Sequence, residues 1–101
     1  MKQPAKKSSE ENKPQHYTIT IKARAVKALK KIPRQAALKL DGLIQSLAEN
    51  PRPAGCKKLE GYANVYRLRY ANYRIVYTVE DKRLIVDVVN IGDRKEIYKN
   101  I

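Results

Sequence analysis

The chain has 101 residues and a formal net charge of +12, so it holds one domain whose strong positive field attracts nucleic acid, anionic membrane or an acidic protein. No apolar run approaches the roughly 18 residues that span a bilayer, and the polar N-terminus is unlike a signal peptide. The single cysteine, Cys56, excludes an internal disulfide and favours a reducing, cytoplasmic location.

The N-terminal part divides into a tail and the start of the domain. Residues 1–15 are almost entirely polar, which predicts a disordered basic and polar tail. The domain is expected over residues 16–101. Residues 16–22 alternate Tyr17, Ile19 and Ile21 with threonines, a pattern that predicts a strand with one buried face.

Two amphipathic helices follow this strand. The first helix is predicted from the helical spacing of Ala25, Val26, Leu29 and Ile32. Pro33 closes this helix and is expected just ahead of the next helix or in its first turn, where its missing N–H costs little. The second helix, about sixteen residues long by its apolar repeat, carries Ala36, Ala37, Leu40, Leu43, Ile44 and Leu47. The segment Asn50-Pro51-Arg52-Pro53 ends it, because a residue before proline is pushed out of the α region.

A β-hairpin is the clearest pattern in the chain. Residues 66–70 and 73–77 alternate strictly around the two-residue turn Ala71-Asn72. The predicted pairs are Tyr70 with Tyr73, Arg69 with Arg74, Leu68 with Ile75 and Tyr66 with Tyr77. The tyrosines share one face with the aliphatic residues and are expected to lie in the core. Arg69, Arg74 and Arg67 share the opposite face. Like charges directly opposite each other cost about 0.2–1 kcal/mol, so such a pair indicates an anion site.

A third strand is predicted over residues 83–91. If Asp81 and Lys82 form a two-residue turn, Val79 pairs with Leu84, Tyr77 with Val86 and Ile75 with Val88. This register places Asp87 on the arginine face, near Arg74 and Arg67, where it would balance a guanidinium. After Gly92, residues 93–98 predict a short helix with Asp93 as N-cap and with Arg94 and Tyr98 on one face.

These elements predict an α+β fold. An N-terminal strand and a helical hairpin would pack on one face of a mostly antiparallel sheet of about four strands, with a short C-terminal helix. The opposite face, which carries the arginines, is expected to be open.

Four arginines and a tyrosine suit one substrate, a phosphodiester of single-stranded RNA. Guanidinium groups present paired donors to phosphate oxygens and stay charged at any cellular pH. Cleavage of RNA needs no metal, because the neighbouring 2′-hydroxyl can attack the phosphorus; the protein positions that attack and stabilises charge. With one histidine, His16, and one cysteine in the chain, we expect neither a metal site nor a cofactor.

From about Tyr17 to Tyr98 the sequence resembles the RelE branch of the RelE/ParE toxins of bacterial toxin–antitoxin modules. The segments that carry the resemblance are Leu29-Lys30-Lys31-Ile32-Pro33, Asn50-Pro51-Arg52-Pro53, Lys58-Leu59-Glu60-Gly61, the two hairpin strands and Ile91-Gly92-Asp93-Arg94-Lys95-Glu96-Ile97-Tyr98. The resemblance implies the RelE-like microbial RNase fold and a ribosome-dependent endoribonuclease that cuts messenger RNA in the ribosomal A site. It also implies neutralisation by a RelB-like antitoxin, with operator DNA bound only through the antitoxin complex.

The resemblance further implies the roles of individual residues. Arg67 and Arg69 would hold ribosomal and messenger phosphates and support proton transfer near the scissile bond. Arg74 and Arg94 would stabilise charge at the scissile phosphate, and Tyr98 would stack on or activate the attacking nucleotide. Further RNA-binding candidates are Lys57, Lys58 and Lys95. The chain departs from the family in two places: some members have lysines where Arg67 and Arg69 stand, and many have histidine at the position of Asp93.

Two other functions remain open from the sequence. A ParE-like protein would share the fold and inhibit DNA gyrase without enzymatic activity, but that branch generally lacks the arginine and tyrosine set. The third possibility is an inactive, basic RNA-binding relative. A highly cationic domain also invites an acidic, partly disordered partner, which agrees with an antitoxin.

Overall fold

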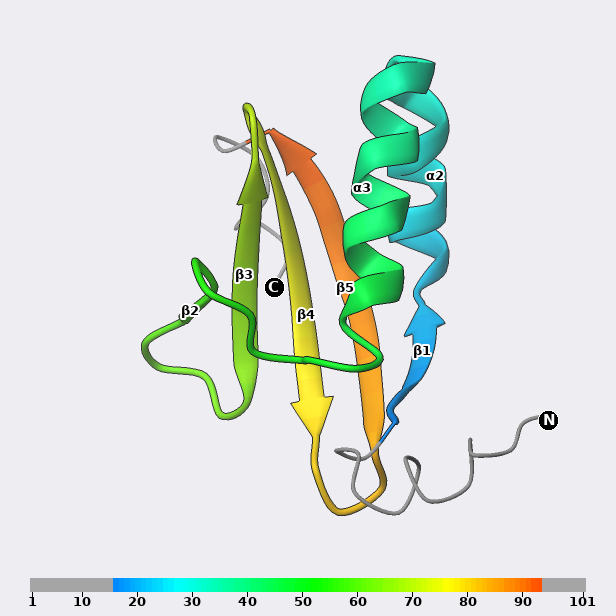
Figure 1. The fold of residues 1–101 in the computed structure, drawn as a ribbon. Coiled ribbons are helices and arrows are strands. Elements are labelled where there is room, and N and C mark those ends of the chain that lie inside the picture. The colour runs from blue at the N-terminus through cyan, green and yellow to red at the C-terminus, as the bar shows by residue number, and fades with distance from the viewer. Residues whose placement is uncertain (1–15, 94–101) are drawn as a thin grey trace, which may run out of the picture.

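The computed structural model describes residues 16–93, in which two helices cover one face of a five-stranded sheet (Figure 1). The strand order is β1-β5-β4-β3-β2; β1 and β5 pair in parallel, and the other neighbours pair antiparallel. The predicted α+β class and one-sided helical hairpin are confirmed. The strand count was too low by one, because β2 (Lys57–Lys58) is too short to show alternation in the sequence. The expected tail at 1–15 and the short C-terminal helix lie outside the described residues.

The first three elements are β1 (Thr18–Ile21), α2 (Ala23–Lys31) and α3 (Arg34–Ser46). Pro33 is the N-cap of α3, just ahead of the helix as predicted, and Ile32 before it is extended. The helix α3 has 13 residues rather than about sixteen, because residues 47–49 form turns before Asn50 and Pro51. Proline therefore ends α2 directly, whereas α3 ends in turns several residues before Pro51.

The predicted hairpin is present with its predicted register. Its strands are β3 (Val65–Tyr70) and β4 (Tyr73–Glu80), and all four predicted pairs occur, including Arg69 opposite Arg74. Ala71 in the turn has φ 55°, a left-handed conformation that is costly for a residue with a side chain. The alternation of the two strands and the short turn together fix which residues face each other.

The register of β5 (Ile85–Asp93) was predicted wrongly. Residues 81–84 form a longer turn, so Val79 pairs with Val86 and Tyr77 with Val88. A shift of two residues returns every side chain to its original face, so hydrophobic alternation does not distinguish the two registers. Asp87 consequently lies opposite Thr78, and its carboxylate accepts from Thr20 Oγ1 (2.7 Å) and from Lys22 Nζ (3.0 Å) rather than from an arginine of the hairpin.

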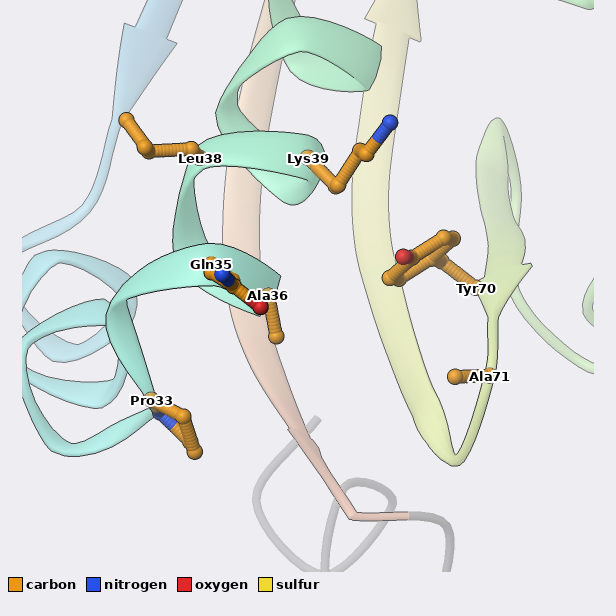
Figure 2. A pocket seen from close by; sticks show the side chains of 7 residues that line it. All are labelled: Pro33, Gln35, Ala36, Leu38, Lys39, Tyr70 and Ala71. Carbon is orange, nitrogen blue, oxygen red and sulfur yellow. The ribbon is translucent and has the colours of Figure 1, made fainter.

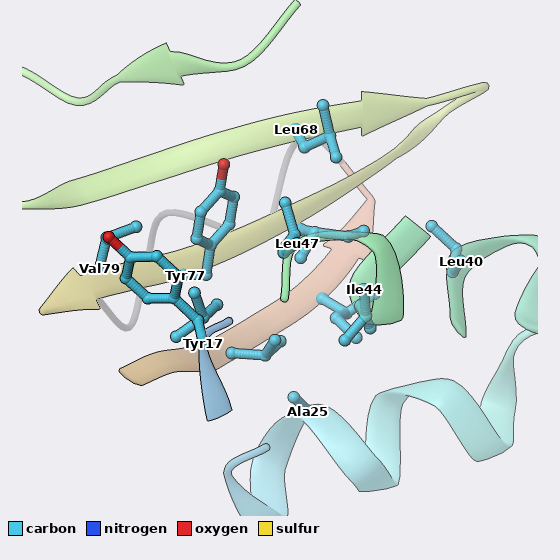
Figure 3. Close-up of a cluster of buried hydrophobic side chains, with 12 residues drawn as sticks. Tyr17, Ala25, Leu40, Ile44, Leu47, Leu68, Tyr77 and Val79 are labelled. Atoms are coloured by element: carbon cyan, nitrogen blue, oxygen red, sulfur yellow. The ribbon is translucent and has the colours of Figure 1, made fainter. Parts of the chain in front are cut away.

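The main core lies between the helices and the sheet (Figure 3). Leu40 and Ile44 of α3, Ala25 of α2 and Tyr77 of β4 have no exposed surface. The other tyrosines of the hairpin, Tyr66, Tyr70 and Tyr73, are partly buried and pack against this cluster, which confirms that the tyrosine face is the core face. The helices thus fix one face of the sheet and leave the arginines on the other.

A polar clamp, made of Arg52, Asp81, Tyr17 and Tyr66, closes one end of the core. The Arg52 guanidinium donates to both carboxylate oxygens of Asp81 (3.2 and 2.7 Å) and from Nε to the Tyr66 hydroxyl (3.0 Å). Tyr17 donates to Asp81 as well (2.6 Å). These hydrogen bonds, led by that from Arg52, hold the pKa of the Asp81 carboxyl below its usual value. The clamp joins the loop after α3 to β1, β3 and the β4–β5 turn.

Candidate functional site

The arginine row comprises Arg67, Arg69 and Arg74 on the sheet face opposite the helices. Arg67 and Arg69 alternate along β3, and Arg74 stands on β4 directly across from Arg69. Residues directly opposite on neighbouring strands have Cβ atoms about 5 Å apart, so two guanidinium groups leave the sheet side by side. Arg69 is exposed, whereas Arg67 and Arg74 are half-buried. The structure therefore brings together the three predicted arginines that it describes.

The arginines of this row have no counter-ion within residues 16–93. By contrast, Arg52 bonds Asp81, and Arg83 approaches Glu80 at 3.6 Å. The Nε atom of Arg74 is buried and has no hydrogen-bond acceptor. Leaving a buried donor unpaired costs about 1–3 kcal/mol. An opposed cationic pair and an unpaired buried donor are both relieved by a bound oxyanion, which accepts hydrogen bonds and neutralises charge.

A β-bulge interrupts the pairing of β5 with β4 beside the arginine row. The pairing shifts between Val76 and Tyr77, so Val88 and Ile91, three residues apart, both lie in the core. As a result Asn90 lies opposite Val76, and Gly92 lies opposite Arg74. Gly92 places no side chain beside the Arg74 guanidinium. The alternation of β5 is broken at residues 88–91, which is the sequence signal of this bulge.

The buried Asn90 was not predicted as part of the site. It is the one polar residue among the buried side chains of residues 16–93, with 8% of its surface exposed. Its side-chain oxygen accepts the backbone N–H of Ile91 at 3.0 Å, next to the bulge. Val76 between Asn90 and Arg67 is fully buried and forms a second cluster with Val65, against which Leu59 packs. The arginine face is therefore only partly open, contrary to the sequence-based expectation.

The two lysines of β2 fall on opposite faces of the sheet. Lys57 pairs with Arg67 and so extends the arginine row, whereas Lys58 pairs with Tyr66 of the core face. Both side chains are exposed. Of this pair only Lys57 joins the predicted RNA-binding group. The predicted site residues Arg94, Lys95 and Tyr98 lie outside the described residues, and Asp93 is the last residue of β5.

A separate hollow lies on the helical side, between α3 and the β3–β4 turn (Figure 2). It has a volume of about 610 Å³ and is lined by Pro33, Gln35, Ala36, Leu38, Lys39, Tyr70 and Ala71. Figure 2 shows the Tyr70 ring leaning from β3 toward α3. Lys39 is its one charged residue, so its chemistry differs from that of the arginine row.

Residues 16–93 contain neither a cluster of metal-binding side chains nor a membrane-spanning helix. No group of three or more histidine, cysteine or acidic side chains there could hold a metal ion. No helix in that part of the chain is long and apolar enough to cross a membrane.

Comparison with known sequences gives a consistent result. Residues 19–98 match the family described as ParE toxin of type II toxin–antitoxin system, parDE. The putative toxin RelE1 of Methanocaldococcus jannaschii is 35% identical over 88 residues, which cover 83% of this chain and 97% of that protein. The mRNA interferase toxin RelE of Escherichia coli is 31% identical over 86 residues, or 81% of this chain and 90% of the relative.

Solved structures with the same fold include toxin–antitoxin complexes. The archaeal RelE–RelB complex from Pyrococcus horikoshii aligns with a TM-score of 0.72 and 26% identity, covering 81% of this chain and 99% of that chain. The intact Escherichia coli RelBE complex aligns with a TM-score of 0.65 and 31% identity, covering 76% and 95%.

Proposed function

Because this chain belongs to the RelE/ParE family of type II toxin–antitoxin toxins, we propose that it is a ribosome-dependent endoribonuclease. It cuts messenger RNA in the ribosomal A site, in the cytoplasm, by attack of the neighbouring 2′-hydroxyl and without a catalytic metal. The observation that carries the proposal is the arginine row, with Arg69 opposite Arg74 and the buried Nε of Arg74 lacking an acceptor. The name of the Escherichia coli relative, an mRNA interferase, supports it.

The row supplies what this reaction needs from the protein. The 2′-oxygen attacks the phosphorus, the bond from phosphorus to the 5′-oxygen breaks, and negative charge builds on the non-bridging oxygens. Arg69 and Arg74 hold these oxygens and stabilise that charge through fixed, charged donors. Arg67, with Lys57 across the ladder from it, holds the adjoining phosphate. The sheet therefore presents neighbouring cationic positions to successive phosphates of one strand.

Proton transfer falls to other groups, because an arginine side chain does not readily lose its proton. One proton leaves the attacking 2′-hydroxyl, and another is taken up by the departing 5′-oxygen. By resemblance to the family, Tyr98 stacks on or activates the attacking nucleotide, and Arg94 adds charge stabilisation. Lys95 is assigned to a peripheral RNA contact, whereas Lys58, on the core face of the sheet, is not.

The antitoxin belongs to the same proposal. Structural neighbours of this chain were solved in complex with RelB antitoxins from archaea and bacteria. We assign this toxin a RelB-like antitoxin, acidic enough to complement its net charge of +12. Contact with operator DNA occurs only through that complex.

A second candidate function is gyrase inhibition of the ParE type. The matching family is described by the name ParE, which favours this function. The arginine row favours the nuclease, since binding to a protein target does not require opposed, unpaired guanidiniums on an exposed sheet face. The two functions can be distinguished by transcript length, because only the nuclease cuts transcripts.

Induction in bacteria tests the proposal. We expect the wild-type chain to arrest growth and to produce new transcript 5′ ends in frame, only where a reporter is translated. Arg74→Ala abolishes both effects, whereas the matched control Arg83→Ala, which removes an exposed arginine at the β4–β5 turn, keeps them. Arrest with intact transcripts and altered DNA supercoiling would assign the chain to gyrase inhibition, and no arrest would indicate an inactive relative.

A further inference from the structure

A basic stripe on α2 faces a groove that the proposed reaction does not use. Arg24, Lys27 and Lys31 follow one another at intervals of three and four residues, so they lie along one side of the helix. They line a groove of about 480 Å³, whose opposite wall contains Tyr73, Ile91, Gly92 and Asp93. Every charged side chain of α2 is positive, so no acidic neighbour on the helix offsets the stripe.

This groove lies at the same end of the sheet as Arg74 but on the helical face. Tyr73, on its far wall, directly precedes Arg74 in β4, and Gly92 is the residue that pairs with Arg74 across the ladder. The helix α2 packs against β5, which holds the stripe next to this end of the sheet. Figure 1 shows α2 running alongside β5 toward the end at which β5 stops. Tyr73 and Arg74 leave β4 on opposite faces, so an RNA strand bound at Arg74 reaches the groove by passing around this end of the sheet.

The charges of the groove favour a polyanion. Lys27 and Lys31 are exposed and form no ion pair with any residue in 16–93, whereas Lys22 just before the helix is paired with Asp87. Among the described residues that line the groove, Asp93 is the only acidic one. From Arg24 to Lys31 the helix rises by about 10 Å, enough to follow an extended backbone rather than a single ion. The half-buried Tyr73 adds an aromatic surface of the kind on which unpaired bases stack.

We propose that the α2 stripe and this groove form a second RNA-binding tract. It holds phosphates of the same RNA assembly just beyond the scissile phosphate at Arg69 and Arg74, and so it rests on the proposed function. Because these cations lie away from the reacting phosphate, they act on substrate and transition state alike. Their loss therefore weakens binding and raises KM while kcat is unchanged.

Binding of purified full-length protein at several salt concentrations tests this tract. The probes are a short single-stranded RNA and purified ribosomes. The variant is Lys27→Gln/Lys31→Gln, and the charge-matched control is Lys30→Gln/Lys39→Gln, whose lysines are exposed but lie outside the groove. Two lost phosphate contacts reduce the slope of log affinity against log salt by about 1.4 for single-stranded RNA. We expect that reduction in the groove variant only, with unfolding in urea unchanged in both.

Each outcome has a defined meaning. A reduced slope with the oligonucleotide identifies messenger RNA in the groove, and one with ribosomes alone identifies ribosomal RNA; both support the tract. Equal slopes for the groove variant and its control would overturn it, as would a loss of antitoxin binding with RNA binding intact. If the wild type binds RNA through the groove but cuts no transcript, the nuclease function fails and the tract stands.

Discussion

Replacing Arg74 by methionine should stabilise the fold while abolishing activity. The substitution keeps a long side chain but removes the charge opposite Arg69 and the buried Nε that has no acceptor. A like-charge pair across a ladder costs about 0.2–1 kcal/mol, and an unpaired buried donor costs about 1–3 kcal/mol. Allowing for some lost packing, we expect the free energy of unfolding to rise by about 1–2 kcal/mol. In a domain of this size each kcal/mol raises Tm by roughly 4–8 °C.

The assay is urea unfolding of the free toxin, with Arg67→Met as the matched control. Arg67 lies on the same face, opposite Val76 in β4 and opposite the exposed Lys57 in β2, so its replacement relieves only an exposed like-charge pair and should raise stability less than that of Arg74. Inorganic phosphate should stabilise the wild type more than Arg74→Met, because in our proposal the opposed pair binds the anion. If Arg74→Met is no more stable than Arg67→Met, then repulsion between Arg69 and Arg74 does not destabilise the free toxin, and the reasoning is refuted.

Three further changes test local features of the fold. Asp81→Asn should make the free energy of unfolding depend less on pH in the acid range, measured by urea titrations. Arg52 holds the pKa of the Asp81 carboxyl below its usual value near 3.8, so the stabilisation from this carboxylate is present above that pH and is lost on acidification. Tyr77→Phe should lower the free energy of unfolding by about 1–2 kcal/mol, because the phenol donates to the Pro51 carbonyl at 2.8 Å. Ala71→Gly should raise Tm by a few degrees in a calorimetric scan, because φ is 55° at this turn.

The hairpin of the site could be predicted from the sequence because its signals are local. Strict alternation on both sides of a two-residue turn leaves one register in which all core side chains share a face. The opposition of Arg69 and Arg74 follows directly from that register. The end of α2 could also be predicted from a local signal, since Pro33 terminates this helix and precedes the next.

Other features depend on contacts that no local pattern encodes. Up to Tyr77 the register of β5 differs from the predicted one by two residues, which moves no side chain to the other face; beyond the bulge the residues change face, so that Asn90 lies opposite Val76 and Gly92 opposite Arg74. The clamp between Arg52 and Asp81 joins residues 29 positions apart, and the groove beside α2 joins the first helix to the end of the last strand. Helical spacing places the cations of α2 on one side of the helix, but it does not show that they lie across from the end of β5.

The chemistry of the cut ends tests the central claim most directly. Purified toxin would be added to ribosomes carrying a defined messenger RNA, and the new termini analysed by mass spectrometry. Attack by the 2′-hydroxyl at a phosphate held by Arg69 and Arg74 predicts a 2′,3′-cyclic phosphate on the upstream fragment and a 5′-hydroxyl on the downstream one, with both absent for Arg74→Ala. A 3′-hydroxyl and a 5′-phosphate, or equal cutting by Arg74→Ala, would contradict the account.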